Sequence, residues 1–293
     1  MKNFKSNIFF IGLLSMLFIN CKPKALEIDI PQEEKKIVIA SMNPIDGIFL
    51  VFATYSYSAL AGDTVGLENY NQFLVKDADV SISYNNEVKK LKMIAPGVYY
   101  GFDIPTFYDI EYKLEVQDPT TNSVINARSY FSKKVKFDTI SISQSEKDTS
   151  VYEIDYSLVD KEPDKRNWYM LDFINLQGYL NILEDTSLIT SISSIADFFK
   201  NDKLYLIDEN RFDDNIIQEK IKVANGYFSK GDILIVTVSS ISEGYYNYLE
   251  AEERAGNLIS SFISEPVSYP TNVDGGYGYF STNFITYKVI EVK

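Results

Sequence analysis

The sequence predicts a mainly β protein, in which an N-terminal immunoglobulin-like or fibronectin-like sandwich is followed by a β-rich mixed domain with about two helices. Three observations lead to this fold class. Short strand-like runs follow one another at a spacing of roughly ten residues, which is typical of sandwiches. Apolar and polar residues alternate within several of these runs. The chain has 293 residues, of which 45% are hydrophobic, and this is enough for one large core or two ordinary ones.

The chain begins with a segment typical of an export signal. Lys2 and Lys5 precede an apolar run of 12 residues from Ile8 to Ile19. This run has the length of a signal-peptide core and falls short of the roughly 20 residues that span a bilayer. Residues 1–20 are therefore predicted to be a lipoprotein signal peptide, since the residue that follows them is a cysteine.

Cys21 is the single cysteine of the chain. A lone cysteine at the end of an export signal is where a bacterial lipoprotein is cleaved and acylated, and no small-x-small cleavage site lies nearby. Ile19 and Asn20 depart from the small residues that usually precede such a cysteine. The alternative is a buried cysteine in an ordinary secretory signal or an N-terminal anchor helix. With acylation, residues 21–35 form the lipidated cysteine and a tether, and several acyl chains hold the protein at the membrane.

Residues 36–138 are predicted to form the first sandwich. Within Ala78–Tyr84, apolar residues alternate with serines, so that one face is buried and the other exposed. Asn85-Asn86 is predicted to form a two-residue hairpin turn, because asparagine tolerates positive φ. Asp118-Pro119 and Asn122 mark another turn. The seven predicted strands are Lys36–Met42, Gly47–Ser56, Ala78–Tyr84, Glu87–Met93, Gly97–Phe102, Asp109–Val116 and Val124–Phe131.

Residues 139–293 are predicted to form the second domain. The runs Asn167–Ile174 and Asp232–Ser240 are apolar on both faces, as central strands are. Ser191–Lys200 carries apolar residues at helical spacing. A capping box is predicted to open a second helix at Ser240, which runs to about Ala255. The boundary between the domains is expected in the polar stretch between Ser132 and Thr149.

Composition excludes several classes of function. The formal charge of −13 and the pI near 4.6 argue against a nucleic-acid partner, because a phosphate backbone would be repelled. The chain has no histidine, so Ser-His-Asp, Cys-His and histidine-zinc sites are excluded. One cysteine rules out an internal disulfide and a cysteine zinc site. We therefore expect no catalytic residues and no enzyme activity.

The glycine-rich stretch Glu265–Phe280 is followed by the strand pattern Phe284–Val292. A phosphate-binding loop needs a helix after its glycines, so a phosphate site is excluded. Asp274-Gly275-Gly276 is instead predicted to be a turn that needs positive φ and leads the last strand into its sheet. The candidates for contact with a partner or ligand in this stretch are Asn272, Asp274, Gly275, Gly276, Tyr277 and Tyr279.

A second candidate site is the acidic stretch around residues 208–215. Asp208, Glu209, Asp213 and Asp214 carry the hard oxygen ligands that Ca²⁺ takes. Their spacing matches no calcium-loop template, which favours a solvated acidic loop. Ca²⁺ is the one cofactor that the sequence suggests.

Acids and tyrosines form two further groups of candidate binding side chains. The acids in Glu250–Glu253 are expected on a solvent-exposed helix face, because neighbouring residues of a helix point in different directions. Most of the 22 tyrosines are expected in cores. Tyr99-Tyr100 and the tyrosines of Tyr245–Tyr248 are the ones predicted to be exposed, where they would contact a sugar or a peptide.

The chain resembles the Bacteroidetes lipoproteins grouped as domain of unknown function 4249. The likeness runs from Cys21 nearly to the C-terminus, and its most specific part is the C-terminal order of strand, tyrosine-rich helix and glycine-rich turn. The segments that carry it are KKIVIASM, KDADVSISYNNEV, APGVYYGF, IEYKLEV, DILIVTVSSISEGYYNYL and ISEPVSYPTNVDGGYGYF.

The resemblance implies an outer-membrane lipoprotein, commonly encoded beside TonB-dependent receptors, with a role as accessory to such a receptor in uptake or outer-membrane assembly. It transfers no catalytic residues. Surface-exposed relatives often carry acidic residues after the cysteine, whereas Lys22-Pro23-Lys24 stands here. Both the cell surface and the periplasmic leaflet are consistent with this N-terminus.

Two other functions stay open at the level of sequence. A carboxylate-based hydrolase of surface glycans would need two carboxylates roughly 5–9.5 Å apart in a tyrosine-lined cleft. A purely structural or adhesive surface module would need neither a cleft nor a receptor.

Overall fold

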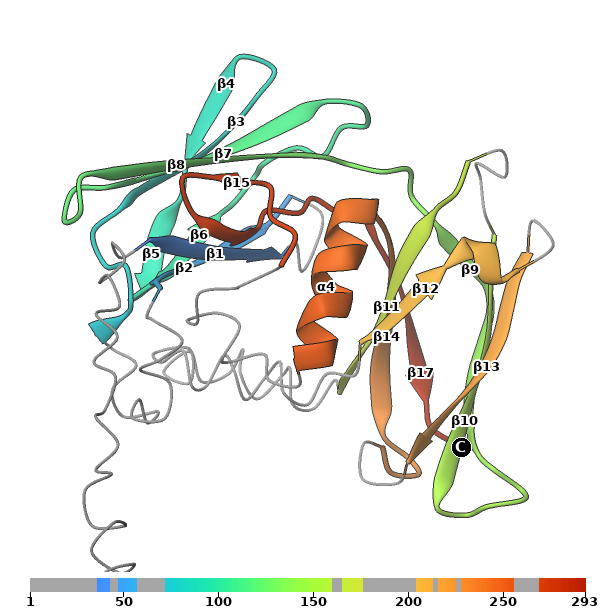
Figure 1. Ribbon diagram of the computed structural model, residues 1–293. Coiled ribbons are helices and arrows are strands. Elements are labelled where there is room, and N and C mark those ends of the chain that lie inside the picture. The colour runs from blue at the N-terminus through green and yellow to red at the C-terminus, as the bar shows by residue number, and fades with distance from the viewer. Residues whose placement is uncertain are drawn as a thin grey trace, which may run out of the picture. The chain divides into compact units, whose positions relative to one another are not determined.

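The computed structural model describes residues 36–42, 47–56, 72–159, 165–175, 204–212, 216–224, 228–255 and 269–293. The signal segment, Cys21 and the predicted helix Ser191–Lys200 lie outside these residues. The described parts form two β-sandwiches and one α-helix, α4 (Glu243–Ala255) (Figure 1). No helix among them is long and apolar enough to cross a membrane. The prediction of a mainly β fold with an N-terminal sandwich is confirmed.

The first sandwich consists of two five-stranded sheets, in the orders β16-β1-β2-β6-β5 and β15-β8-β7-β3-β4. Their inward-facing side chains form one hydrophobic core, centred on rings such as Phe49, Tyr112 and Phe131. The bounds of the strands are β1 Ile37–Met42, β2 Phe49–Tyr55, β3 Asp79–Tyr84, β4 Glu87–Lys90, β5 Lys92–Ala95, β6 Val98–Gly101, β7 Glu111–Asp118, β8 Ser123–Tyr130, β15 Val273–Asp274 and β16 Tyr277–Tyr279.

Strand β3 shows why the alternating pattern was a reliable signal. Val80, Ile82 and Tyr84 point into the core, while the serines between them stay partly exposed. Asn85 and Asn86 then adopt φ values of 45° and 64°, which is the two-residue hairpin turn that the sequence predicted.

The predicted strand Glu87–Met93 is in fact two strands in different sheets. β4 pairs with β3 at the edge of one sheet, and β5 pairs with β6 at the edge of the other. Leu91 lies between them, is buried, and donates its backbone N–H to the carbonyl of Val80 at 2.8 Å. The chain therefore crosses from sheet to sheet along this side of the sandwich.

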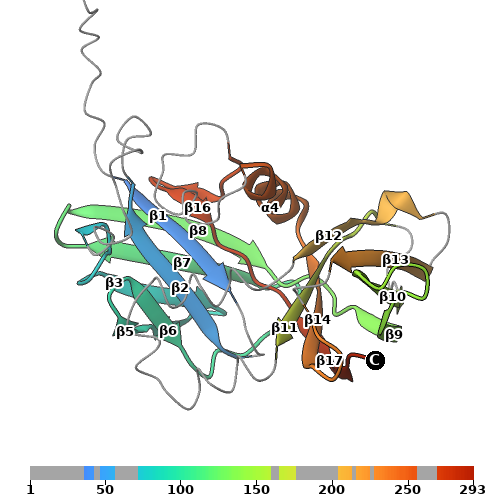
Figure 2. The same ribbon diagram turned by 90° about the horizontal axis from the view of Figure 1, so that it is seen from below.

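The opposite side of the sandwich is completed by residues from the C-terminal end of the chain. β16 pairs in parallel with β1, and β15 pairs antiparallel with β8. Figures 1 and 2 show this red segment beside the blue β1. The predicted turn Asp274–Gly276 thus joins one sheet to the other, and the last strand, β17 (Ile285–Glu291), begins only after residues 280–284.

The second sandwich has sheets in the orders β13-β10-β9 and β12-β11-β14-β17, hereafter the three-stranded and the four-stranded sheet. Its separate core lies between them, and the predicted central strands β11 and β14 are indeed paired with each other. The bounds of its strands are β9 Lys136–Gln144, β10 Val151–Val159, β11 Trp168–Asn175, β12 Tyr205–Asp208, β13 Ile216–Ala224 and β14 Ile233–Ile241, together with β17.

The linear division of the chain at residues 138 and 139 does not coincide with the strand pairing. These residues lie inside β9, and the buried residues change from the first core to the second between Phe131 and Val135. Residues 273–279 belong to sheets of the first sandwich. The reason is that strand pairing, rather than sequence order, assigns a segment to a core.

Helix α4 begins two residues later than predicted. β14 continues through Ile241, and Ser242 rather than Ser240 caps the helix, since its Oγ accepts the backbone N–H of Tyr245 at 3.2 Å. The helix packs on the outer face of the four-stranded sheet, where Ile241, Trp168 and Met170 contact its buried tyrosines. This packing positions Tyr245 and Tyr248, two of the tyrosines that the sequence analysis singled out.

Candidate functional site

The glycine-rich turn is held in place by Asn272. The side-chain amide of Asn272 donates to the carbonyls of Arg128 and Phe280, both at 2.7 Å, and its carbonyl accepts the N–H of Phe280 at 2.9 Å. A side chain that forms three such bonds has little capacity left for a ligand. Asn272 therefore fixes the two ends of the turn, and its contact with a partner stays a prediction.

Two glycines explain the composition of the turn. Gly275 has a φ of +80° at the bend itself. Gly278 has a φ of +94°, and a Cβ at this position would overlap the carbonyl oxygen of Ile39 on β1. Glycine is required here both for the backbone conformation and for the close approach of β16 to β1.

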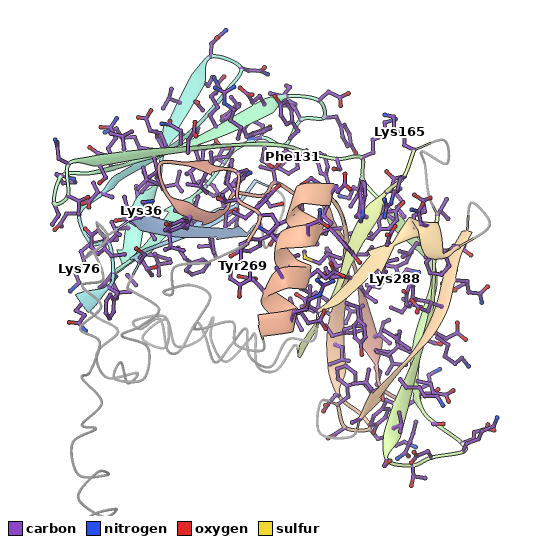
Figure 3. The ribbon with its side chains drawn as sticks, viewed as in Figure 1. Lys36, Lys76, Phe131, Lys165, Tyr269 and Lys288 are labelled. Atoms are coloured by element: carbon purple, nitrogen blue, oxygen red, sulfur yellow. The ribbon has the colours of Figure 1, made fainter. Side chains whose placement is uncertain are left out.

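The residue just before β1 contacts the turn. The Lys36 ammonium donates to the hydroxyl of Tyr277 at 3.2 Å and lies 5.0 Å from the centre of its ring. This is the geometry of a cation–π contact. Figure 3 shows Lys36 close to this C-terminal segment. Lys36, the first described residue, therefore lies on the same part of the surface as the turn.

The five candidate contact residues other than Asn272 separate into two groups. Asp274 and Gly275 are exposed, and Gly276 and Tyr277 are partly exposed, so these four form a continuous surface segment, hereafter the turn surface. Tyr279 is only 9% exposed and points toward α4. Contact of the turn surface with a partner stays a prediction.

Tyr279 belongs to a second cluster, whose members the sequence analysis did not bring together. Its ring packs against Tyr245 and Tyr248 of α4 at centroid distances of 5.3 and 5.5 Å. Tyr269, labelled beside α4 in Figure 3, packs against Tyr248 at 6.2 Å. Gly244 makes this possible, because a Cβ there would overlap the Tyr279 hydroxyl. The four rings connect β16 of the first sandwich to α4.

Asp172 lies on β11, on the face of the strand that α4 covers. Its neighbours two and four residues earlier, Met170 and Trp168, pack against the helix, whereas Leu171 and Phe173 point into the core of the sandwich. Asp172 keeps some accessible surface, but protein surrounds its carboxyl on most sides. An acid within the apolar run NWYMLDFI was the sequence signal that could have identified it.

Glu252 of α4 contributes a second buried carboxyl group to this cluster. It is 5% exposed and accepts a hydrogen bond from the hydroxyl of Tyr248. Tyr245 lies within electrostatic range of both Glu252 and Asp172. Burial, followed by the charge of Glu252, raises the pKa of both Tyr245 and Tyr248 above the ordinary value. Burial also raises the pKa of Asp172 to about 6, against an opposing hydrogen bond from Phe173 N–H.

A family model, described as domain of unknown function DUF4249, matches residues 24–285. The chain belongs to the DUF4249 family. The match covers the greater part of the described residues, including the first sandwich, α4, the turn surface and most of the second sandwich, and it ends at the first residue of β17. No curated protein matches this DUF4249 chain.

A solved structure of the chicken CNTN1 FN1–FN3 domains matches this DUF4249 chain with 10% sequence identity and a TM-score of 0.23. The match covers 86% of the DUF4249 chain and 63% of the chicken chain. The DUF4249 chain thus spans less than two thirds of the structure that it matches.

The predicted exposure of the tyrosine groups is wrong for most of their members in this DUF4249 chain. Tyr99 is 2% exposed and donates its hydroxyl to the carbonyl of Val75 at 2.9 Å in the first core. Tyr246 and Tyr248 are 6% and 4% exposed. Their rings are buried because α4 turns this face toward the four-stranded sheet, which a count of tyrosines could not reveal.

Asp208 and Glu209, the two described acids of the acidic stretch, both accept hydrogen bonds from other parts of the protein. Asp208 binds the guanidinium of Arg166 through two hydrogen bonds of 3.2 and 2.5 Å. Glu209 accepts the backbone N–H of Asn167 at 2.8 Å. Asp213 and Asp214 lie outside the described residues. Within the described parts of the chain, no cluster of three acidic, histidine or cysteine side chains is placed to hold a metal ion.

The acids of α4 do not share one environment, although all three were expected on a wet face. Glu253 is exposed and Glu250 partly so, whereas Glu252 is buried. The expectation is therefore wrong for Glu252. Its position three and four residues from Leu249 and Tyr248 places it on the buried face of the helix.

Proposed function

We propose that this DUF4249 chain is an outer-membrane lipoprotein that acts as a non-enzymatic partner of a TonB-dependent receptor in uptake or outer-membrane assembly. The observation that carries the proposal is the N-terminal sequence, in which a signal-like segment ends at Cys21, the only cysteine. Acylation at Cys21 would keep the folded part at the membrane surface. The receptor is proposed from the family resemblance.

The position of the turn surface supports this arrangement. Lys36, which contacts Tyr277, stands 15 residues after Cys21 (36 − 21). Fifteen residues span at most about 50 Å when fully extended. The turn surface is therefore confined to within about 50 Å of the anchored cysteine. A receptor in the same membrane would lie within reach of the exposed Asp274 and Gly275.

Photo-cross-linking in cells tests the proposed contact. With a photoreactive residue in place of the exposed Asp274, we expect a covalent adduct with a TonB-dependent receptor. Adding Cys21→Ala to this variant should abolish the adduct, because the protein would no longer be held at the membrane.

The matched control places the same photoreactive residue at Lys147, an exposed position in the turn between β9 and β10 of the second sandwich. We expect little receptor adduct from this position. Equal receptor adducts from both positions would contradict the assignment to the turn surface, and adducts from neither would contradict receptor contact through it.

The α4 cluster is the observation that favours the alternative function, a carboxylate-based glycan hydrolase. Asp172 has the raised pKa of a general acid, and Glu252 supplies a second carboxyl among tyrosines. Packed rings cover Glu252, however, so a glycan would need α4 to move aside. Glycan hydrolysis that is abolished by Asp172→Asn would establish this function in place of the non-enzymatic one.

A further inference from the structure

Three polar side chains lie next to one another on the outer face of the four-stranded sheet. Asp172 of β11 and Thr237 of β14 are directly opposite each other in the strand register, and Ser239 lies two residues further along β14 on the same face. Side chains that are directly opposite have Cβ atoms about 5 Å apart, and diagonal neighbours are about 7–8 Å apart. These three side chains, hereafter the polar strip, are therefore within reach of one small ligand.

The polar strip contains oxygen atoms that the described protein groups leave unpaired. Ser239 is 1% exposed, and its Oγ has no hydrogen-bond partner among the described residues. Within the same parts of the chain, the carboxyl group of Asp172 accepts one hydrogen bond, which the N–H of Phe173 donates to Oδ1 at 2.8 Å. Buried polar groups of native proteins are almost always paired, so these atoms point to a bound polar group.

Asp172 also lacks a counter-charge. Burial raises its pKa to about 6, and no positive charge in the described parts of the chain acts against that shift. A carboxylate that is largely removed from water is stabilised by a cation, so the electrostatics favour a positively charged ligand. The surface of Asp172 that stays accessible gives such a ligand a way in.

An exposed apolar surface continues from the polar strip onto β17. Tyr287 is opposite Thr237 in the strand register and is 65% exposed. Val289 is opposite Ile235 and is 58% exposed. Because alternate residues of a strand share a face, these side chains lie on the same outer face as the polar strip. They offer contact to an alkyl chain, and the ring of Tyr287 also attracts cations.

We propose that the polar strip binds a primary alkylammonium ligand. The carboxylate of Asp172 and the hydroxyls of Thr237 and Ser239 supply three acceptors, which match the three N–H donors of a primary ammonium group. The alkyl chain of the ligand lies along Tyr287 and Val289. A free alkylamine and the side chain of a lysine share this chemistry. The polar strip is separate from the turn surface, which belongs to the first sandwich, so amine binding and receptor contact are tested independently.

Saturation-transfer NMR of the full-length protein in mild detergent tests amine binding, with n-butylammonium as the probe. The titration is done at pH 7.5, above the Asp172 pKa of about 6, so that the carboxyl group is ionised. We expect a dissociation constant on the order of 1 mM. Tetramethylammonium, which has no N–H group, and the neutral alcohol butan-1-ol should each bind at least about tenfold more weakly. Equal binding of either compound, or no binding of n-butylammonium, would overturn the proposal.

Variants of the polar strip and its surroundings locate the binding. Asp172→Asn keeps the shape of the side chain and removes its charge, so the affinity for n-butylammonium should fall about tenfold or more. Ser239→Ala should lower the affinity without lowering the stability, because its hydroxyl has no partner to lose among the described residues. If Asp172→Asn does not fold, Tyr287→Ala takes its place. It changes an exposed side chain and should lower the affinity about threefold.

Glu291→Gln is the matched control, because Glu291 is an exposed carboxylate on the same face of β17 as Tyr287. This variant should keep the wild-type affinity. Unchanged affinity in Asp172→Asn, or an equal loss in Glu291→Gln, would show that the polar strip is not the site and would overturn the proposal.

A second probe distinguishes the two sources of the ammonium group. N-acetyl-lysine methylamide carries the amine on a lysine side chain, with both ends blocked as in a polypeptide. Tighter binding of this probe than of n-butylammonium would support the proposal with a lysine of a partner protein as the ligand. Weaker binding would support it with a free alkylamine as the ligand.

Discussion

Replacement of Gly278 by alanine is expected to lower the free energy of unfolding by about 4 kcal/mol or more. The residue has a φ of +94°, which strains any residue with a side chain. Its new Cβ would also overlap the carbonyl oxygen of Ile39, which belongs to the strand paired with β16. To relieve the overlap, β16 must separate from β1, and the first sandwich then loses an edge strand.

Gly231→Ala is the matched control for this experiment. Gly231 has nearly the same φ, +91°, but a Cβ there would meet nothing within 4 Å. We therefore expect a loss of only about 1 kcal/mol from backbone strain. Urea denaturation followed by the fluorescence of the single tryptophan compares the two variants. Equal losses would show that the contact between β16 and β1 does not stabilise the fold.

The second large effect is expected at Asp118, the last residue of β7. Its carboxylate is 2% exposed and accepts hydrogen bonds from the hydroxyl of Tyr55 at 2.7 Å and from the hydroxyl of Thr121 at 2.6 Å. Tyr55 is on β2, so the first of these bonds joins the two sheets. Asp118→Ala should lower the free energy of unfolding by about 3 kcal/mol at pH 7, because buried donors lose a charged acceptor.

The effect of Asp118→Ala should depend on pH with a defined sign. Burial alone would raise the pKa of Asp118, but hydrogen bonds from Thr121, Tyr55 and the Thr120 N–H outweigh it and hold the pKa below its usual value. The stabilisation is therefore complete above the usual aspartate pKa and is lost as the pH falls through the lower folded pKa.

Urea titrations at pH 7 and pH 3 measure the difference between wild type and the Asp118→Ala variant, which should shrink at the lower pH. Asp79→Ala, at an exposed aspartate of the same sheet, should change stability little at either pH. A difference at Asp118 that stays constant with pH would mean that ionised Asp118 contributes nothing to the stability.

The parts of the fold that sequence could predict are those that local patterns determine. Strand β3 and its Asn85-Asn86 turn follow from alternation and from the φ tolerance of asparagine. β9 was missed because only Phe137 and Ile142 of its nine residues are buried, which leaves a mostly polar run. An edge strand of this kind carries too few apolar residues for periodicity to identify it.

The remaining differences come from contacts between residues that are distant in the sequence. The pairing of Val38 with Tyr277 joins the two ends of the described chain, and no local signal in either segment specifies its partner. Asp172 could be recognised as a polar residue in an apolar strand, but the packing of α4 on that face of the sheet could not be predicted from local pattern. Local pattern therefore predicts the turn Asp274–Gly276, whereas tertiary packing decides which segments surround it.

Co-purification from solubilised outer membranes tests most directly whether the chain is an anchored partner of a TonB-dependent receptor. Affinity-tagged wild-type protein and a Cys21→Ala variant are isolated in mild detergent, and the bound proteins are quantified by mass spectrometry. We expect the wild type to retain a TonB-dependent receptor at near-equal amount and the variant, which lacks the anchor, to retain none. Recovery of the wild-type protein without a receptor, also after cross-linking, would contradict the proposed function.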